Sequence, residues 1–204
     1  MITIDKLLSI EKNNLHEASK AIPGDDLVQL VEWLMEKDDK IRYQAFLLLQ
    51  ARAEYSDEVY TFWDTFKGKL SSENSYQRSI GLMLIGDNSK WDKDDKLKDT
   101  IDEYLLCLKD EKPITVRQCL QSLCKIVQCN NQLHMKIANA IMAVNISEVK
   151  ETMRKTTLTD MLSVLAIIRK HGTTDEIEEF IFKALSGGIL DKKAIKQVET
   201  MMAL

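Results

Sequence analysis

Apolar residues recur along the chain at the spacing of an α-helix. Five stretches carry an apolar residue at relative positions 0, 3, 4 and 7, and their first residues lie 32, 42, 36 and 40 positions apart. The five sets are Leu27, Leu30, Val31, Leu34; Val59, Phe62, Trp63, Phe66; Ile101, Tyr104, Leu105, Leu108; Ile137, Ala140, Ile141, Val144; and Ile177, Phe180, Ile181, Ala184. This spacing puts four side chains on one face of a helix. A helical unit that recurs about every 40 residues is typical of stacked two-helix repeats.

A second apolar pattern follows each of the first four stretches and opens with a basic residue. The four basic residues are Arg42, Arg78, Arg117 and Lys155. Apolar or small residues lie three, six and seven positions after each of them, which again defines one helical face. The repeated unit is therefore predicted to be helix, short turn, helix. Lys192 with Ile195 and Val198 suggests a degenerate fifth copy.

The helices are expected to form one all-α domain. Residues 1–22 contain two short apolar patterns and are expected to cap a repeat array over residues 23–204. The predicted fold is a right-handed α-α superhelix of about five helix pairs, with Leu105 and Ile141 in its core. Seven Gly and two Pro are too few for an all-β protein with many tight turns.

The chain resembles the HEAT-like family of α-helical repeats over residues 25–186, and more loosely as far as Leu204. The resemblance rests on the two-helix unit, the apolar spacing and the basic residue near the start of each second helix. It implies a curved solenoid in which the second helices line the concave face. An acidic residue stands six positions before Arg42 and Arg117 but not before Arg78 or Lys155. The sequence therefore does not predict a regular acid-to-base ladder between repeats.

Charge is unevenly distributed along the chain. The net charge is −4, with −7 on residues 1–110 and +3 on residues 111–204. A nucleic-acid-binding protein usually presents a basic surface that neutralises several phosphates, so nucleic acid is not an expected partner. Unbroken apolar runs such as residues 45–49 are far shorter than the roughly 20 residues of a membrane-spanning helix. Charged residues interrupt the N-terminal segment where a signal peptide would be apolar. A cytoplasmic location without membrane contact is expected.

No group of side chains in the sequence has the spacing of a catalytic or metal site. The cysteines are Cys107, Cys119, Cys124 and Cys129. They form no C-x-x-C pair, so reduced, mostly buried thiols are expected. The three histidines are far apart in the sequence, and no pair of metal ligands is expected among them. Nucleophile-elbow, phosphate-loop and dinucleotide motifs are absent. No catalytic residue, cofactor or metal is therefore predicted, and a non-catalytic role is favoured.

The acidic stretch from Gly86 to Asp95 is predicted to be the one long polar connection. Its carboxylates offer oxygen ligands for a hard cation, but the stretch lacks the ligand spacing and the central Gly of a calcium site. A solvated loop, held against the helices by Trp91, is favoured.

The basic residues that open the second helices allow two interpretations. A cation at a helix N-terminus opposes the macrodipole and needs an acidic neighbour or an anionic ligand. Pairing with acids in the turns, such as Asp38 and Asp39, or across adjacent repeats is favoured, because repeat proteins are held together by nearest-neighbour contacts. An anion-binding stripe formed by the four basic residues is the alternative.

The second helices of the first two units carry apolar residues on the side turned away from their partner helix. These residues are Phe46, Leu47, Leu82 and Met83, and Tyr43 falls on the same side. The corresponding positions of the next two units are polar. A contiguous exposed apolar patch would mark a protein-binding site. Packing of the same residues against neighbouring repeats or beneath residues 1–22 is favoured, because exposed patches are rare on monomers.

Two hypotheses about function come from different classes. The first is a non-catalytic interaction or scaffold protein that binds a peptide, helix or protein partner on a curved surface. The second is a DNA glycosylase of alkylation repair, because some HEAT-like proteins remove alkylated bases from DNA with residues on the concave face. The acidic charge opposes the second hypothesis. A lyase or cofactor-attaching enzyme built on helical repeats has no supporting motif. The identity of the partner and the oligomeric state stay open.

Overall fold

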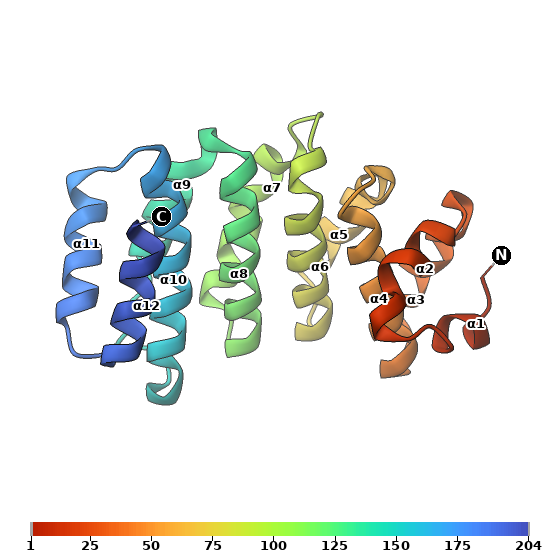
Figure 1. Ribbon diagram of the computed structural model, residues 1–204, viewed down its shortest axis with the longest axis horizontal. Helices are drawn as coiled ribbons and strands as arrows, with labels where there is room; N and C mark the ends of the chain where they lie inside the picture. The colour runs from red at the N-terminus through yellow and green to blue at the C-terminus, as the bar shows by residue number, and fades with distance from the viewer. Residues whose placement is uncertain (1, 204) are drawn as a thin grey trace. The chain divides into compact units, whose positions relative to one another are not determined.

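The computed structural model describes residues 2–203, and these residues form α-helices joined by turns and short loops (Figure 1). Twelve α-helices and no β-strand occur among them. The predicted all-α class is therefore confirmed. Leu204, the last residue of the predicted array, lies outside the described residues.

The chain divides into two compact units, Met1–Leu97 and Lys98–Leu204. Unit 1 contains α1 (Ile4–Leu8), α2 (Leu15–Ala21), α3 (Leu27–Trp33), α4 (Asp39–Ala53), α5 (Trp63–Lys69) and α6 (Ser75–Asn88). Unit 2 contains most of α7 (Lys96–Leu106), then α8 (Pro113–Cys129), α9 (His134–Met142), α10 (Glu151–His171), α11 (Asp175–Ser186) and α12 (Lys192–Ala203). Short 3-10 turns are η1 (Lys12–Asn14), η2 (Gly24–Asp26), η3 (Glu58–Phe62), η4 (Ser89–Trp91), η5 (Cys107–Lys109) and η6 (Asn131–Leu133). One continuous domain across the division stays a prediction.

The helices of each unit pack against their neighbours in the chain. In unit 1, α4 contacts α1, α2 and α3, and α6 contacts both α5 and α4. In unit 2, α10 contacts α9 and α11, and it also contacts α8 and α12 (Figure 1). First and second helices therefore alternate from α3 to α12, as the two apolar patterns predict.

Most positions of the predicted apolar pattern lie in the core. Every side chain of the five sets is buried or half-buried, and Trp63, Phe66 and Tyr104 are among the largest that are fully enclosed. Ile141 is fully buried, as predicted. The prediction for Leu105 is wrong, because this side chain is only half-buried. It lies at the edge of the buried face of α7, beside the exposed Leu106.

A buried arginine joins the N-terminal helices to the rest of unit 1. Arg52, near the end of α4, donates to the main-chain oxygens of Ser19 at 2.6 Å and Ile22 at 3.3 Å, at the end of α2. Its guanidinium also pairs with Glu58 at 2.6 Å. The Arg52 hydrogen bond lowers the pKa of the Glu58 carboxyl below its usual range. Cations near a helix C-terminus satisfy its free carbonyl groups. The end of α2 therefore has a specific anchor on α4.

The predicted loop from Gly86 to Asp95 is shorter than expected. α6 continues beyond Gly86, and a 3-10 turn covers Ser89–Trp91. Gly86 is buried inside the helix, where packing overrides its low helix propensity. Trp91 donates its indole N–H to the main-chain oxygen of Ala53 at 2.8 Å. It therefore holds this segment against the end of α4, as expected.

Gly81 allows α6 to approach α5 closely. A Cβ atom on Gly81 would lie 2.7 Å from the main-chain oxygen of Phe66 and 3.0 Å from the Cβ of Lys69. We expect Gly81→Ala to lower the free energy of unfolding by about 1 to 2 kcal/mol, because the clash with backbone outweighs the gain in helix propensity.

Gly68, also in a helix, is the matched control, because a Cβ atom added there would have no neighbouring atom within 4 Å. Gly68→Ala is expected to raise the free energy of unfolding by up to about 1 kcal/mol through helix propensity alone. Urea unfolding of both variants checks the pair. Equal stabilisation by the two substitutions would show that α5 and α6 are not in close contact at Gly81.

Candidate functional site

We call the four basic residues predicted at the start of the second helices the basic column (Arg42, Arg78, Arg117 and Lys155). Two of them donate hydrogen bonds to the turn that precedes their own helix. Arg42 and Arg78 are the fourth residues of α4 and α6. Arg42 donates to the main-chain oxygen of Glu36 at 2.7 Å and pairs with Asp39. Arg78 donates to the main-chain oxygens of Ser72 at 2.8 Å and Glu73 at 3.0 Å. Because the acceptors are main-chain oxygens, no acidic side chain is needed six positions earlier.

A third arginine has the same role, and the sequence pattern did not identify it. Arg154, the fourth residue of α10, donates to the main-chain oxygens of Val149 at 2.9 Å and Ser147 at 2.7 Å. The predicted residue, Lys155, instead donates to Asp191 at 2.9 Å, and this hydrogen bond lowers the pKa of the Asp191 carboxyl. Arg154 would have been identified from its position as the fourth residue of the helix, whereas the prediction relied on the distance to the next apolar residue.

The remaining member of the column connects two second helices. Arg117 in α8 donates to the Asp160 carboxylate in α10 at 3.0 Å. Both side chains are largely screened from solvent, with 33% and 14% of their surfaces exposed. Each of the four predicted basic residues is thus paired within its own unit. Arg42, Arg117 and Lys155 contact acidic side chains, as the favoured interpretation expects, whereas Arg78 donates to main-chain oxygens.

The predicted apolar patch is not exposed as a whole. Phe46 and Leu82 are buried, with 5% and 0% of their surfaces accessible, so the hypothesis that they belong to an exposed partner-binding patch is wrong, and they are packed as the favoured interpretation expects. α4 is packed by α1, α2, α3 and α6, and α6 is packed by α4 and α5, which leaves these two positions inside. Leu47 and Met83 are half-buried, and Tyr43 alone is exposed.

An exposed aromatic and basic surface lies at the start of α4 and α6 instead. We call it the Tyr43–Tyr76 surface, and it consists of Lys12, Met35, Arg42, Tyr43 and Tyr76. Tyr43 and Tyr76 expose 50% and 67% of their surfaces, and Met35 exposes 64%. The Arg42 guanidinium lies 5.7 Å from the ring centre of Tyr76, and the Lys12 ammonium lies 5.4 Å from that of Tyr43. Both distances are within the range of cation–π contacts.

The sequence pointed to only part of this surface. Tyr43 follows a basic residue of the column and was predicted. Tyr76 precedes Arg78 by two positions, on the first turn of α6, and the comparison of positions after each basic residue could not include it. A search for large side chains on both sides of the basic column would have found it.

A buried lysine lies behind Met35. Lys69 is 6% exposed, and its ammonium donates to the Gln77 side-chain oxygen at 2.5 Å and to the Met35 sulfur at 3.1 Å. Gln77 in turn donates to the main-chain oxygen of Leu34 at 2.7 Å. Neither partner of Lys69 is a carboxylate, and burial lowers the pKa of Lys69 to about 8. A cation in this position is costly, because burial disfavours the charged form.

Lys69→Met is expected to stabilise the protein at pH 7 by about 1 to 2 kcal/mol, because removal of the buried charge outweighs the loss of the hydrogen bonds to Gln77 and to the Met35 sulfur. Below pH 8 Lys69 is protonated in both the folded and the unfolded state, so the native protein carries the full penalty. Between pH 8 and the usual lysine pKa of 10.5, only the folded state releases its proton. Stability relative to Lys69→Met should therefore rise with pH in that window.

Chemical unfolding at pH 7 and pH 10 measures this difference directly, since other titrating groups are common to both proteins. A variant that is less stable than the native protein at pH 7, with the same difference at pH 10, would show that Lys69 carries no penalty.

The cysteines and histidines form no metal site among residues 2–203. Cys107 and Cys119 are buried, Cys124 is half-buried and Cys129 is exposed, and all four are thiols rather than halves of a disulfide. Burial raises the pKa of Cys119 well above its usual value and that of Cys124 to about 11, so neither is a reactive thiolate at neutral pH.

Two histidines that are distant in the sequence are neighbours in unit 2. The rings of His134 and His171 have centres 5.3 Å apart. His134 is buried, and its Nε2 atom shares a hydrogen bond with the main-chain oxygen of Val127 at 2.7 Å. Although the two residues are far apart in the sequence, α9 and the end of α10 bring their rings together.

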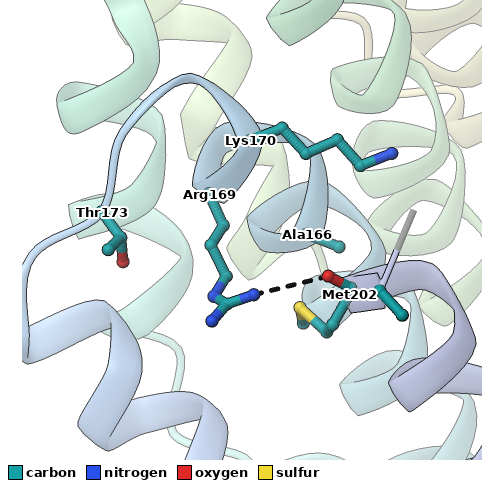
Figure 2. A pocket seen from close by; sticks show the side chains of 6 residues that line it. Ala166, Arg169, Lys170, Thr173 and Met202 are labelled. Atoms are coloured by element: carbon teal, nitrogen blue, oxygen red, sulfur yellow. Dashed lines mark hydrogen bonds between the residues drawn. The ribbon is translucent and has the colours of Figure 1, made fainter.

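A small cleft opens near the end of the chain (Figure 2). Its volume is about 490 Å³, and Arg169 and Lys170 are among the residues that line it. Arg169 points towards the main-chain oxygen of Met202, to which it donates at 3.4 Å (Figure 2). It also pairs with Glu178 at 2.6 Å. The guanidinium is thus already neutralised, and the cleft does not resemble a built anion site.

No protein-family model matches the sequence, and no curated protein matches it. The structure is similar to the crystal structure of an engineered protein, with a TM-score of 0.50 over 99% of this chain and 95% of that chain. The two sequences are 15% identical, so the similarity concerns the fold alone. Within the described residues, every helix is too short or too polar to cross a membrane.

Proposed function

We propose that this chain is a non-catalytic interaction or scaffold protein that binds a protein or peptide partner through the Tyr43–Tyr76 surface. The observation that carries the proposal is the exposure of two tyrosines and a methionine beside Arg42. Tyrosine, methionine and arginine are enriched in protein interfaces, and tyrosine and arginine are frequent among the residues that dominate binding energy. Rigid aromatic side chains on helices lose little conformational entropy when a partner binds.

We further propose that the chain is a HEAT-like repeat array, in which five helix pairs stack as a curved solenoid. Three features support this proposal: the apolar pattern of about 40 residues, the alternation of first and second helices, and the arginines that close three of the turns. In a repeat array each unit contacts its nearest neighbours and the array presents an extended binding surface.

Replacing both tyrosines with alanine is expected to weaken binding of the partner at least tenfold, because each is an exposed anchor with no buried role. The melting temperature should stay unchanged, since surface substitutions usually alter stability by less than about 0.5 kcal/mol. Affinity capture from the native cell, with quantitative mass spectrometry of native and variant protein, provides the measurement.

Phe182→Ala is the matched control, because Phe182 is an aromatic residue of unit 2 with 71% of its surface exposed. It should retain the partner that the Tyr43→Ala/Tyr76→Ala variant loses. Loss of the same partner from both variants, or from neither, would argue against this surface.

A further inference from the structure

Three second helices carry an arginine as their fourth residue, and α8 does not. Arg42, Arg78 and Arg154 donate to main-chain oxygens five to seven residues earlier, in the turn before the helix. The fourth residue of α8 is Val116, which has no side-chain donor. Counting back five to seven residues from Val116 gives residues 109–111. The turn before α8 therefore lacks a guanidinium from its own helix.

The fourth residue of α12 is also apolar, but its turn receives a cation from elsewhere. Ile195 occupies this position, and the Lys155 ammonium from α10 reaches Asp191 in the turn before α12. A neighbouring helix thus supplies the positive charge there. This comparison shows that the turns of unit 2 can accept a cation that their own helix does not carry.

A cleft of about 810 Å³ lies in unit 2 where α8 lacks the arginine. Val116 and the turn residues 109–111 line one part of it, and Glu148, Val149 and the buried Thr157 line another. Its volume is in the range of known ligand sites. The cleft is large enough for a side chain that enters from outside and reaches the turn.

The charged side chains of the cleft suit a guanidinium. Those that line it are Asp110, Glu111, Glu148, Lys109 and Lys150, with one more negative than positive charge. Asn145 donates to Glu148 at 2.9 Å, and Lys112 lies 3.3 Å from Glu111. A carboxylate accepts several hydrogen bonds, so both glutamates can take a further donor. The planar, five-donor guanidinium suits a mixed set of carbonyl and carboxylate oxygens better than an ammonium does.

We propose that this cleft receives an arginine side chain from a protein partner, which completes the turn before α8 as Arg42, Arg78 and Arg154 complete theirs. The guanidinium donates to main-chain oxygens of the turn and to the carboxylates of Glu111 and Glu148. The proposal rests on the proposed function only in assigning the arginine to a protein. The cleft lies in unit 2 and shares no residue with the Tyr43–Tyr76 surface. Either proposal can therefore be refuted while the other holds.

The test uses N-acetylarginine amide as the probe and the full chain labelled at its valine methyl groups. The expected result is a saturable shift of the Val116 and Val149 methyl signals, with a dissociation constant on the order of millimolar. N-acetylcitrulline amide has nearly the same shape without the charge, and it should bind at least about fivefold more weakly. Equal binding of the two probes, or shifts scattered over the surface, would overturn the proposal.

Two sets of variants complete the test. Val116→Arg supplies the missing guanidinium from the chain itself, and it should abolish probe binding without lowering the melting temperature. Glu111→Gln/Glu148→Gln should weaken probe binding at least about fivefold, since charge-assisted bonds are lost. Glu179→Gln, an exposed carboxylate on α11 outside the cleft, should leave it unchanged. Native affinity in the double glutamine variant would refute the site even if Val116→Arg failed to fold.

Discussion

Replacing Arg52 with methionine is expected to lower the free energy of unfolding of the chain by about 3 to 5 kcal/mol. The substitution removes donors from the main-chain oxygens of Ser19 and Ile22 and leaves Glu58 without its cation. The main cost comes from the main-chain oxygens, because a buried acceptor left without its donor costs about 1 to 3 kcal/mol, whereas the Glu58 side chain is 41% exposed and can be solvated. The end of α2 should also lose this polar anchor on α4.

Arg169→Met is the matched control for this prediction. Arg169 pairs with Glu178 at the same distance of 2.6 Å, but the Arg169 side chain is 39% exposed, whereas that of Arg52 is 10% exposed. Exposed pairs contribute about 0 to 1 kcal/mol, so this variant should remain close to native stability. Urea unfolding gives both energies, and hydrogen exchange should show faster exchange in α2 only for Arg52→Met. Similar losses in the two variants would mean that the Arg52 network has no special role.

Ile141→Ala is expected to destabilise the protein by about 2 to 5 kcal/mol, whereas Leu105→Ala should cost about 1 to 2 kcal/mol. Ile141 is fully buried in α9, so its truncation leaves a cavity that the surroundings cannot fill. Leu105 is half-buried, and solvent already reaches part of its side chain. Thermal and urea unfolding of the two variants gives the comparison. A larger loss at Leu105 would contradict the assigned orientation of α7.

These two positions show what a periodic pattern predicts and what it does not. Spacing of 3 and 4 residues identifies the face of a helix that is turned inwards, and it placed Ile141 and Leu105 on such a face. The width of the buried face depends on which helices pack against it, and this depends on contacts between segments distant in sequence. Leu105 lies at that edge, so the pattern alone could not separate it from Ile141.

The burial of Phe46 and Leu82 likewise depends on contacts between segments that are distant in sequence. The pattern predicts that Phe46 and Leu82 are turned away from the partner helix of their own pair, but α4 and α6 each have further neighbours. The short helices α1 and α2 pack against α4, and Gln44 donates to the main-chain oxygen of Ile10 at 2.7 Å. Packing, which was the favoured interpretation, is therefore the outcome for Phe46 and Leu82.

The role of the arginines could be predicted only in part. The basic column was visible in the sequence, but its acceptors in unit 1 are main-chain oxygens, which any residue provides. Lys155 was chosen over Arg154 because it lies three positions before the next apolar residue of the pattern. The first residue of a second helix does not stand at a constant distance from that apolar residue. The absence of an arginine from the start of α8 became apparent only when the helix starts were known.

Site-specific photo-crosslinking tests the proposed protein-binding function most directly. Benzoylphenylalanine placed at Tyr76 keeps an aromatic ring on the Tyr43–Tyr76 surface, and the same group at Phe182 controls for exposure. After illumination in the native cell, the Tyr76 position is expected to give one predominant covalent product with a partner protein, and the Phe182 position is not. The same products from both positions, or no product from Tyr76, would contradict the proposal that this surface binds a partner.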